Sequence, residues 1–469
     1  MRLSGPIKEF GYFWLPEYPD TKRPGILHIS EGGEVKLDVR GLLDDPLDVS
    51  FIRGPLKRLV GRIENSENSL ITLDHCHPRP QTTNFGRMSQ SVINAQYAYV
   101  GVGSDTHEAL TFSELNFSVE GLDEWLSIRG ITVENHFDVD RERMQATIRY
   151  NQPENIQIQL PPDIDLTFRS RMSMTSAGSH VTEATIKQKA YISLRSRVPK
   201  PVEGFLALIQ KITHFLGFAM DTTVSVNALT AYSDELTIEI RKGKKHRVPV
   251  EIYYSSTATS EVKPPVRGHH MLFQYEQIAH ELQKMMTNWL THYESAEPAF
   301  NAYFASPRDA YHYLDGRFLS LVQGIEILHR RHSDTTAMPE PEFAQLVTTI
   351  LESCPTDKQK WLKERLMDGN DLLLRERLAD LLEPFQRSYG SSRDTETFLS
   401  AVIETRHALI HHDKGLSEKG LTGTDLWKLC RQLEGLFQLH VLRLTGLTVE
   451  HINRLANDNH ALGEKLNDN

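Results

Sequence analysis

The stretch SEVKPPVRGHH (residues 260–270) divides the chain into two parts with different hydrophobic patterns. Before it, apolar and polar residues alternate with a period of two, as in VKLDV (35–39), IQIQL (156–160) and LTIEI (236–240). Side chains of a strand point alternately to its two faces, so this alternation predicts strands with one buried face. After it, the alternation stops. The stretch is therefore interpreted as a linker between a β-rich domain and a helical domain.

The N-terminal part, residues 1–265, is expected to be an antiparallel, β-sandwich-like domain. Many short strands separated by turn residues are typical of a sandwich or a barrel. One helix is expected among the strands, because apolar residues from Phe205 to Ala219 recur at spacings of three and four. Pro201 precedes them, where a helix start tolerates proline. We expect this helix to pack on a sheet.

The C-terminal part, residues 266–469, is expected to be an all-helical bundle, which makes the chain an α+β, multidomain protein. Short Gly, Pro, Ser and Asp breaks separate segments with a helical period of apolar residues. The expected helices are 272–293, 307–331, 341–353, 357–367, 371–386, 394–413 and 424–456. The polar tail after Asn457 is expected to fray.

Composition bounds the class of protein. The chain has 469 residues and a net charge of −10, so the broad positive charge of a general nucleic-acid-binding protein is absent. Cys76, Cys354 and Cys430 show no metal-ligand spacing and fit a reducing cytoplasm. Neither a signal peptide nor a membrane-spanning run is evident, and no cofactor-binding motif is found. We therefore expect a cytoplasmic protein without a membrane partner or a cofactor.

Arg406 occupies an unusual position in the expected helix 394–413. Apolar residues from Phe398 to Ile410 form a helical stripe, and at about 100° per residue Arg406 falls near its middle. A guanidinium on an apolar face is costly unless it meets an anion or a partner chain. An RNA phosphate is one candidate for that anion, and a carboxylate in the core of the same chain is the other.

His411 follows five positions later, and the two residue types suit metal-free RNA cleavage. Histidine titrates near neutral pH and can act as general base or acid, whereas arginine stays charged and grips phosphate oxygens. Five residues turn a helix by about 500°, so Arg406 and His411 point about 140° apart. Two copies of the helix across a two-fold axis would bring both to one phosphate, which predicts a homodimer or a higher homo-oligomer. The alternative is that the helix ends near His411.

The Arg-x4-His pattern, with the polar His407 after the arginine, resembles the HEPN ribonuclease motif. Residues 318–330, FLSLVQGIEILHR, resemble the first long HEPN helix of ApeA-like proteins. The segments that resemble the ApeA N-terminal domain are GYFWLP (11–16), PGIL (24–27), FSEL (112–115) and Trp125. The order of the two domains extends the resemblance to ApeA-like anti-phage defence proteins over nearly the whole chain.

This resemblance implies a function. ApeA-like proteins act in bacterial anti-phage defence by abortive infection, and HEPN ribonucleases are generally metal-independent and leave a 2′,3′-cyclic phosphate and a 5′-hydroxyl. Arg406 and His411 would then be the catalytic pair of a toxin with endoribonuclease activity, sharing a site in a dimer. His407 would orient the substrate or the partner; the alternative is a solvated helix residue without such a role. A structured RNA such as tRNA is a candidate substrate, and the N-terminal domain is a candidate receptor for a phage-derived activator.

Supporting residues are expected around this pair. Glu326 projects from the flank of the apolar face of 318–330, where it could hold the fork of Arg406 in place or pair with Arg330 at i+4. The candidate RNA contacts are His412, Lys414, Lys244 and Lys245.

The stretch DHCH (74–77) groups four residues of metal-ligand type. Adjacent strand residues point to opposite faces, so at most two of them would converge without a turn. No second ligand pair is evident in the sequence. We therefore expect no metal site.

Two other functions fit the same residues. The helical bundle could bind RNA or a nucleotide without cutting it, with Arg406 as an anion clamp only. The β-rich domain, which carries Tyr12, Trp14 and Trp125, could bind a carbohydrate or a peptide and serve as a ligand sensor.

Overall fold

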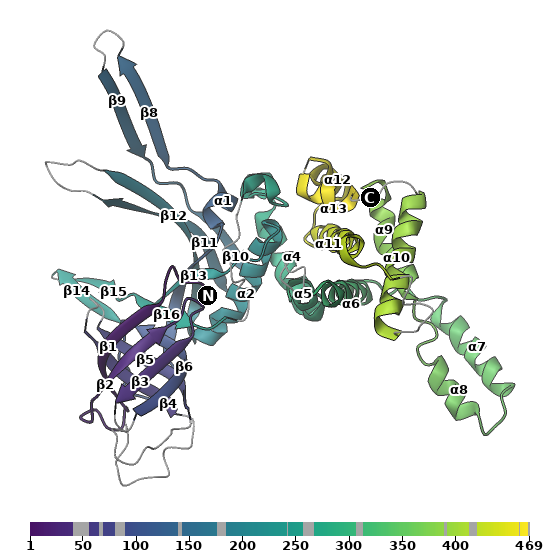
Figure 1. Ribbon diagram of the computed structural model, residues 1–469, viewed down its shortest axis with the longest axis horizontal. Coiled ribbons are helices and arrows are strands. Elements are labelled where there is room, and N and C mark those ends of the chain that lie inside the picture. Colours follow the sequence, from purple (N-terminus) through teal and green to yellow (C-terminus); the bar gives the residue numbers. More distant parts are fainter. Residues whose placement is uncertain are drawn as a thin grey trace. The chain divides into compact units, whose positions relative to one another are not determined.

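The structure, a computed structural model, divides into two compact units, Met1–Gln283 and Lys284–Asn469 (Figure 1). Each unit is described by itself. The described residues are 1–40, 56–64, 69–79, 90–138, 143–175, 184–241, 243–256, 267–305, 313–388, 392–411, 420–458 and 460–467. The first unit is rich in strands and the second is helical, so the predicted α+β, two-part architecture is confirmed.

Twelve of the described strands of the first unit form one continuous antiparallel sheet. These strands are β1 (Ile7–Trp14), β2 (Arg23–Ile29), β3 (Val35–Arg40), β4 (Leu56–Ile63), β5 (Leu70–Pro78), β6 (Gln90–Val100), β7 (Thr111–Val119), β10 (Ile156–Leu160), β11 (Ile164–Thr175), β12 (Thr185–Pro201), β13 (Val226–Tyr232) and β16 (Val250–Tyr254). Two hairpins stand apart from it: β8 (Ile131–Asp138) with β9 (Arg143–Tyr150), and β14 (Thr237–Arg241) with β15 (Lys244–Arg247). This unit also contains the α-helices α1 (Leu122–Leu126), α2 (Val202–Ala219) and α3 (Tyr275–Ile278), and a 3-10 helix (Gly268–His270).

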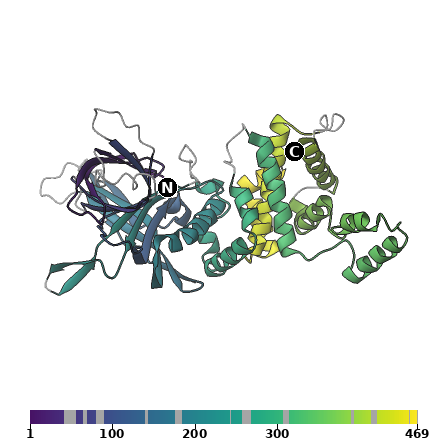
Figure 2. The same cartoon turned by 90° about the horizontal axis from the view of Figure 1, so that it is seen from below.

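Six strands close on themselves in the order β6-β3-β2-β1-β4-β5, because β5 also pairs with β6. We call this ring the closed sheet; its purple strands curve round in Figure 2. Its interior holds one apolar core, which includes Phe13, Leu37 and Leu73. A Cβ on Gly61 would lie 2.4 Å from the ring of Phe13, so only glycine fits beside that ring. Of the sandwich and the barrel that the strand pattern allowed, strand pairing here gives the closed form.

The remaining strands continue from β6 through β16 as an open sheet, in the order β16-β13-β7-β12-β11-β10. Helix α2 packs against β7 and β12, as the apolar spacing predicted, and Phe205, Ile209 and Phe215 of this helix are fully buried. Trp125 of α1 is also buried, and its ring contacts Phe215. One face of the open sheet is therefore the core of this half of the unit.

The first unit extends beyond residue 265, where the hydrophobic pattern changes. The indole nitrogen of Trp125 donates to the Phe273 carbonyl at 3.1 Å, and the Phe273 amide donates to the Ala219 carbonyl at 3.3 Å. Phe273 is itself buried. These contacts attach residues 267–283 to the β-rich unit, although their sequence lacks strand alternation.

The second unit consists of helices joined by short connections. Its described helices are α4 (Leu282–Ser295, which begins just before the unit boundary), α5 (Glu297–Phe304), α6 (Leu314–His332), α7 (Glu340–Glu352), α8 (Gln359–Leu366), α9 (Leu374–Leu382), a 3-10 helix (Glu383–Ser388), α10 (Ser392–His411), α11 (Gly423–Leu444), α12 (Val449–Asp458) and α13 (His460–Asn467). Helix α6 contacts α5, α9, α10 and α11. Most helices lie where the sequence predicted them, and α6 is central to the packing.

The sequence prediction was wrong at the C-terminal end. The expected helix 424–456 is interrupted after Leu444, because Gly446 adopts a φ of +102°, which ends α11. The tail that was expected to fray instead forms α13, whose Leu462 and Leu466 are buried. A Cβ on Gly435 of α11 would lie 2.7 Å from the Leu466 side chain, so the absence of a side chain there allows α13 to pack closely.

Candidate functional site

Arg406 lies in the penultimate turn of α10, at the border of the buried face of this helix. Val402 and Thr405 are fully buried, whereas 36% of the Arg406 side chain is exposed. Ile410, one turn further on, is 48% exposed. The expectation that Arg406 stands in the middle of the buried stripe was therefore wrong, because Thr405 and Ala408 join the buried face and Ile410 leaves it. The guanidinium is neither sealed inside the unit nor fully in solvent.

The last turns of α10 contact Gly420 and Leu421, which lie just before α11. The Leu421 amide donates to the Thr405 hydroxyl at 3.2 Å. A Cβ on Gly420 would lie 2.7 Å from the Cβ of Ala408, so this residue must be small. Both contacts neighbour Arg406 in sequence, so they fix the backbone that presents its side chain.

Glu326 of α6 is the described carboxylate that faces Arg406. Its Oε2 lies 3.9 Å from Arg406 Nη2, and its Oε1 accepts a 3.4 Å hydrogen bond from Arg330 Nη2. Both pairings that the sequence allowed for Glu326 are thus present. Arg330 also donates to Asp371 at 2.6 Å. One carboxylate is shared by two guanidinium groups, so most donors of Arg406 are not engaged by Glu326.

The same helix carries a histidine whose structural role the sequence reading missed. His329 is buried, its Nδ1 accepts a 3.3 Å hydrogen bond from Arg377 Nη1, and its Nε2 lies 2.8 Å from Asp380 Oδ2. These partners assign the ring proton to Nε2, which donates to Asp380. His329 therefore ties α6 to α9 and holds the helix that positions Glu326. The sequence did carry a signal of this buried role, because His329 follows Ile325 by one helical turn on the apolar face of α6.

Comparison with known families matches both units. Residues 8–289, more than half of the chain, match the model of ApeA N-terminal domain 1. The chain belongs to the ApeA family. Residues 319–451 match the Apea-like HEPN model, and this range contains Glu326 and Arg406. No curated protein and no solved structure matches the chain.

The ApeA-like assignment supports a coarse function. HEPN domains are typically ribonucleases, so the matches support an anti-phage defence protein with a nuclease role. Among the described residues, no helix is both long and apolar enough to span a membrane.

The other predicted site residues divide between the two units. His407 is exposed on α10. His411 is the last residue of α10, and its side chain lies outside the described residues, as do His412 and Lys414. Lys245 is exposed on β15 of the first unit, and the Lys244 side chain is not described. The structure thus brings Glu326 to Arg406 and places the basic hairpin in the other unit.

The DHCH stretch of β5 does not form a metal centre. Asp74 receives a fork of two 2.6 Å hydrogen bonds from the buried Arg58, and Cys76 is buried in the closed sheet, where burial raises its pKa. His75 has a φ of +51° and lies 3.7 Å from Glu203. Within the described part of the chain, no group of three or more ligand side chains could hold a metal ion.

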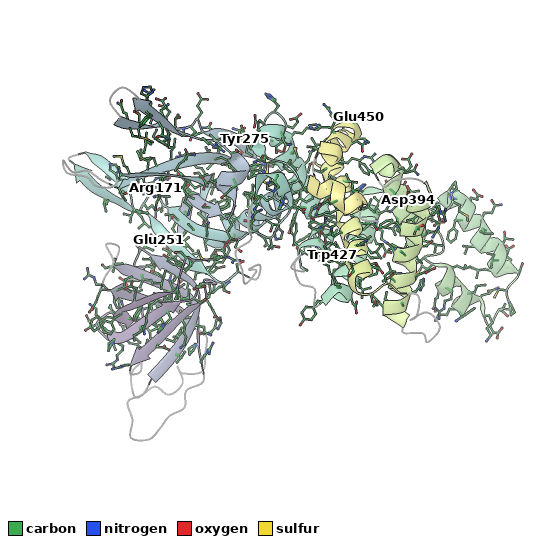
Figure 3. The ribbon with its side chains drawn as sticks, turned by 45° about the horizontal axis from the view of Figure 1, so that its top comes forward. Arg171, Glu251, Tyr275, Asp394, Trp427 and Glu450 are labelled. Carbon is green, nitrogen blue, oxygen red and sulfur yellow. The ribbon has the colours of Figure 1, made fainter. Side chains whose placement is uncertain are left out.

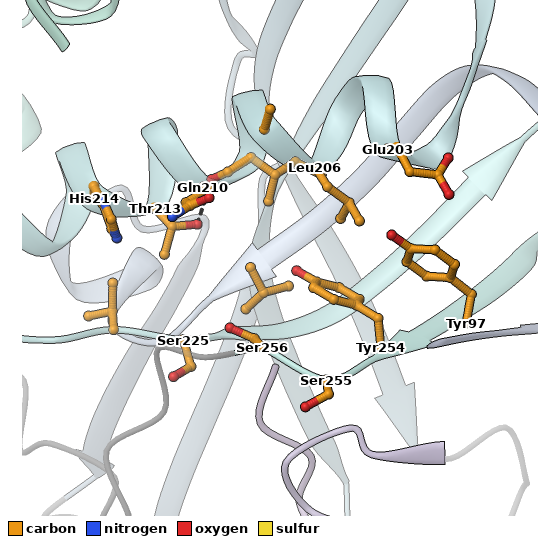
Figure 4. A pocket seen from close by; sticks show the side chains of 14 residues that line it. Tyr97, Glu203, Leu206, Gln210, Thr213, His214, Ser225, Tyr254, Ser255 and Ser256 are labelled. Carbon is orange, nitrogen blue, oxygen red and sulfur yellow. Dashed lines mark hydrogen bonds between the residues drawn. The ribbon is translucent and has the colours of Figure 1, made fainter. Parts of the chain in front are cut away.

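A cavity of about 390 Å³ lies beside α2 in the first unit (Figure 4). Glu203 and Tyr97 face each other at one end, and His214 lies at the other. Burial lowers the pKa of His214 to about 4 and raises that of Tyr254 to about 12, so both are neutral at pH 7. The described lining contains no lysine or arginine. The cavity can therefore offer hydrogen bonds and one carboxylate, but not the cation that phosphate chemistry requires.

Proposed function

We propose that this protein is a metal-independent endoribonuclease of the HEPN type that acts in anti-phage defence by abortive infection. One observation carries the proposal: Arg406 is part-exposed at the end of α10, and its described carboxylate partner lies at 3.9 Å. A guanidinium held this loosely keeps donors available for phosphate oxygens. The matched range of the Apea-like HEPN model, residues 319–451, includes position 406, which supports the proposal.

The proposed chemistry uses the 2′-hydroxyl of RNA as the nucleophile. A base removes its proton, the 2′-oxygen attacks the adjacent phosphorus, and an acid protonates the departing 5′-oxygen. The products are a 2′,3′-cyclic phosphate and a 5′-hydroxyl. Arg406 stabilises the phosphorane, whose extra negative charge develops on the non-bridging oxygens. His411 acts as the general base or acid, and Glu326 orients the Arg406 fork.

We propose that the site is completed by a second copy of the chain. Positions 406 and 411 lie about 140° apart around the axis of an ideal helix, so we do not expect one copy to aim both side chains at the same phosphate. Ile410 lies one turn from Arg406 and is 48% exposed, an apolar surface that a second α10 would cover. His407 would then orient the substrate or the partner.

The substrate is expected to be chosen by shape, because a net charge of −10 disfavours binding to bulk RNA. A structured RNA such as tRNA fits this requirement. The residues proposed to contact the phosphate backbone of the RNA are His412, Lys414, Lys244 and Lys245. The β-rich unit is proposed to receive the phage-derived signal.

An assay of RNA cleavage in EDTA tests the proposal with three proteins: wild type, Arg406→Ala and His411→Ala. We expect the wild type alone to cut, without added metal. A wild type that binds RNA but leaves it intact, with His411→Ala binding equally well, would instead establish the second candidate, a non-catalytic anion clamp.

Mixing the two inactive variants tests the shared site. If one site uses Arg406 from one copy and His411 from the other, a mixed dimer regains one intact site and a fraction of the activity. A mixture that stays inactive although mixed dimers are shown to form would contradict the shared arrangement, as would a fully active monomer in sedimentation.

A further inference from the structure

The open sheet carries a second, larger cavity, of about 690 Å³. It lies where residues 170–172 of β11 are next to residues 189–191 of β12. Strands β7, β11, β12 and β13 line it, together with the end of β9. The polar and aromatic side chains that matter are Asn116, Tyr150, Arg171, Lys189, Tyr191 and Tyr232. The described residues that line it include no carboxylate. This cavity thus has the opposite charge character to the one beside α2.

Two buried polar atoms in the lining have no hydrogen-bond partner among the described residues: Asn116 Oδ1 and the Tyr150 hydroxyl. A buried polar group without a partner costs about 1–3 kcal/mol, so such groups are rare in native proteins. Because both atoms lie in the wall of one cavity, an occupant of that cavity can supply the two hydrogen bonds.

Two cations of the lining lie side by side, as a binding site for an anion requires. Arg171 on β11 is directly opposite Lys189 on β12, and both are exposed (Figure 3 labels Arg171). Like charges directly opposite each other destabilise a sheet unless an anion bridges them. Arg169, two residues before Arg171, has a buried Nε without a hydrogen-bond partner among the described residues. Lys189 is in electrostatic range of Asp123, and no described acid pairs with Arg171.

Tyrosine rings flank these cations. Tyr191 is the cross-strand neighbour of Arg169, and Tyr232 lies on β13 with Arg247 stacked at 5.1 Å from its ring centre. Arg247 is itself held by Glu114 at 2.6 Å, so Tyr232 is fixed in place. Aromatic rings beside cations are the combination that binds a planar base together with a phosphate.

We propose that this cavity binds a nucleoside phosphate. Arg171 and Lys189 bind the phosphate, Tyr191 stacks on the base, and the Asn116 carboxamide pairs with the base edge, as asparagine does with adenine. A volume of about 690 Å³ is the size of a small-molecule site and holds one such ligand. The proposal concerns the β-rich unit and does not depend on the nuclease activity.

Calorimetry with the full-length protein tests the proposal. The probes are the four ribonucleoside triphosphates, with tripolyphosphate as a probe without a ring and adenosine as one without phosphate. We expect at least one triphosphate to bind. It should bind at least about tenfold more tightly than tripolyphosphate, which lacks the base contacts, or adenosine, which lacks the phosphate contacts.

The double variant Arg171→Ala/Lys189→Ala is expected to weaken that binding at least about tenfold. Both side chains are exposed, so the fold is expected to persist, and a thermal melt checks it. The matched control is Arg197→Ala, a cation of the same strand β12 that is 72% exposed and pairs with Asp163 instead. It should bind like the wild type. Absence of binding by all four triphosphates, equal binding of tripolyphosphate, or an equal loss in the control would each overturn the proposal.

Discussion

Two arginines of the helical unit, Arg317 and Arg406, are held in opposite ways. Arg317 of α6 is 4% exposed, and its Nε and Nη2 donate to Glu434 Oε1 at 2.9 and 2.5 Å. Lys465 of α13 adds a second cation 3.6 Å from the same carboxylate. Arg406 is 36% exposed and lies 3.9 Å from Glu326. The first arginine uses its donors inside the chain, whereas Glu326 leaves most donors of the second one unengaged. Burial and contact distance thus separate a buried structural cation from the part-exposed one that we propose binds RNA.

The largest expected effect is on RNA cleavage by Arg406→Ala. Losing a cation that stabilises a developing phosphorane should lower the cleavage rate about a thousandfold. The stability should change little, because a part-exposed ion pair contributes at most about 1 kcal/mol. Cleavage rates and thermal melts of wild type and variant check both statements.

Arg375→Ala provides the matched control for this variant. Arg375 lies on α9, is 44% exposed and pairs with Glu396 of α10, the same helix that carries Arg406. Cleavage by Arg375→Ala should match the wild type. A comparable loss would mean that any disturbance of α10 stops cleavage, and the assignment to Arg406 would fail.

Arg317→Ala should have the reverse profile. Removing one partner of a buried ion pair leaves an uncompensated charge, and a cost of about 3 kcal/mol in the free energy of unfolding is expected. Lys465 limits this cost by remaining near Glu434. Denaturant unfolding measures it. If Arg317→Ala were no less stable than Arg406→Ala, burial would not distinguish the two arginines.

The contrast between buried and exposed charged groups also predicts how the stability depends on pH, through His440. Burial lowers the pKa of His440 from 6.5 to about 3, so the unfolded chain binds a proton at this residue between those values and the folded chain does not. Stability therefore falls as the pH drops below about 6.5, by about 2 kcal/mol at pH 5 from this residue. Chemical unfolding at pH 7 and pH 5 should show a smaller difference for His440→Leu than for wild type. Equal differences would contradict the inference that His440 is neutral in the folded protein.

The smallest effect is expected from Glu326→Gln. Glutamine keeps the shape and one acceptor of Glu326, so the orientation of Arg406 is weakened and not lost. Cleavage should fall less than tenfold, roughly 1 kcal/mol of transition-state stabilisation. A loss as large as that of Arg406→Ala would reverse the roles given to these two residues.

Local periodicity predicted the elements that have an apolar face of their own. The alternation of β3 and β10, the three-and-four spacing of α2 and the long stripe of α6 each identify one element without reference to others. The closure of six strands could not be predicted in this way, because the pairing of β5 with β6 joins strands whose register depends on the whole sheet.

The residue types of the candidate site and the pairing of Glu326 with Arg406 were predictable, but the burial of Arg406 was not. The sequence pointed to Arg406 and Glu326, but its apolar stripe placed Arg406 in the middle of the buried face. Thr405 is polar and was left out of that stripe, yet it is fully buried, because its hydroxyl accepts a hydrogen bond from Leu421. Because of this tertiary contact, the buried face of α10 is centred on other residues than the apolar stripe suggested, and Arg406 lies at its border. The local sequence pattern does not contain that information.

The central claim is that Arg406 serves an RNA-cutting site, and the chemistry of RNA ends tests it most directly. RNA is sequenced from cells that express wild type or Arg406→Ala, with end capture specific for 2′,3′-cyclic phosphates and 5′-hydroxyls. The account predicts matched pairs of these ends at discrete positions with wild type and their absence with Arg406→Ala. The same ends with both proteins, or with neither, would contradict it.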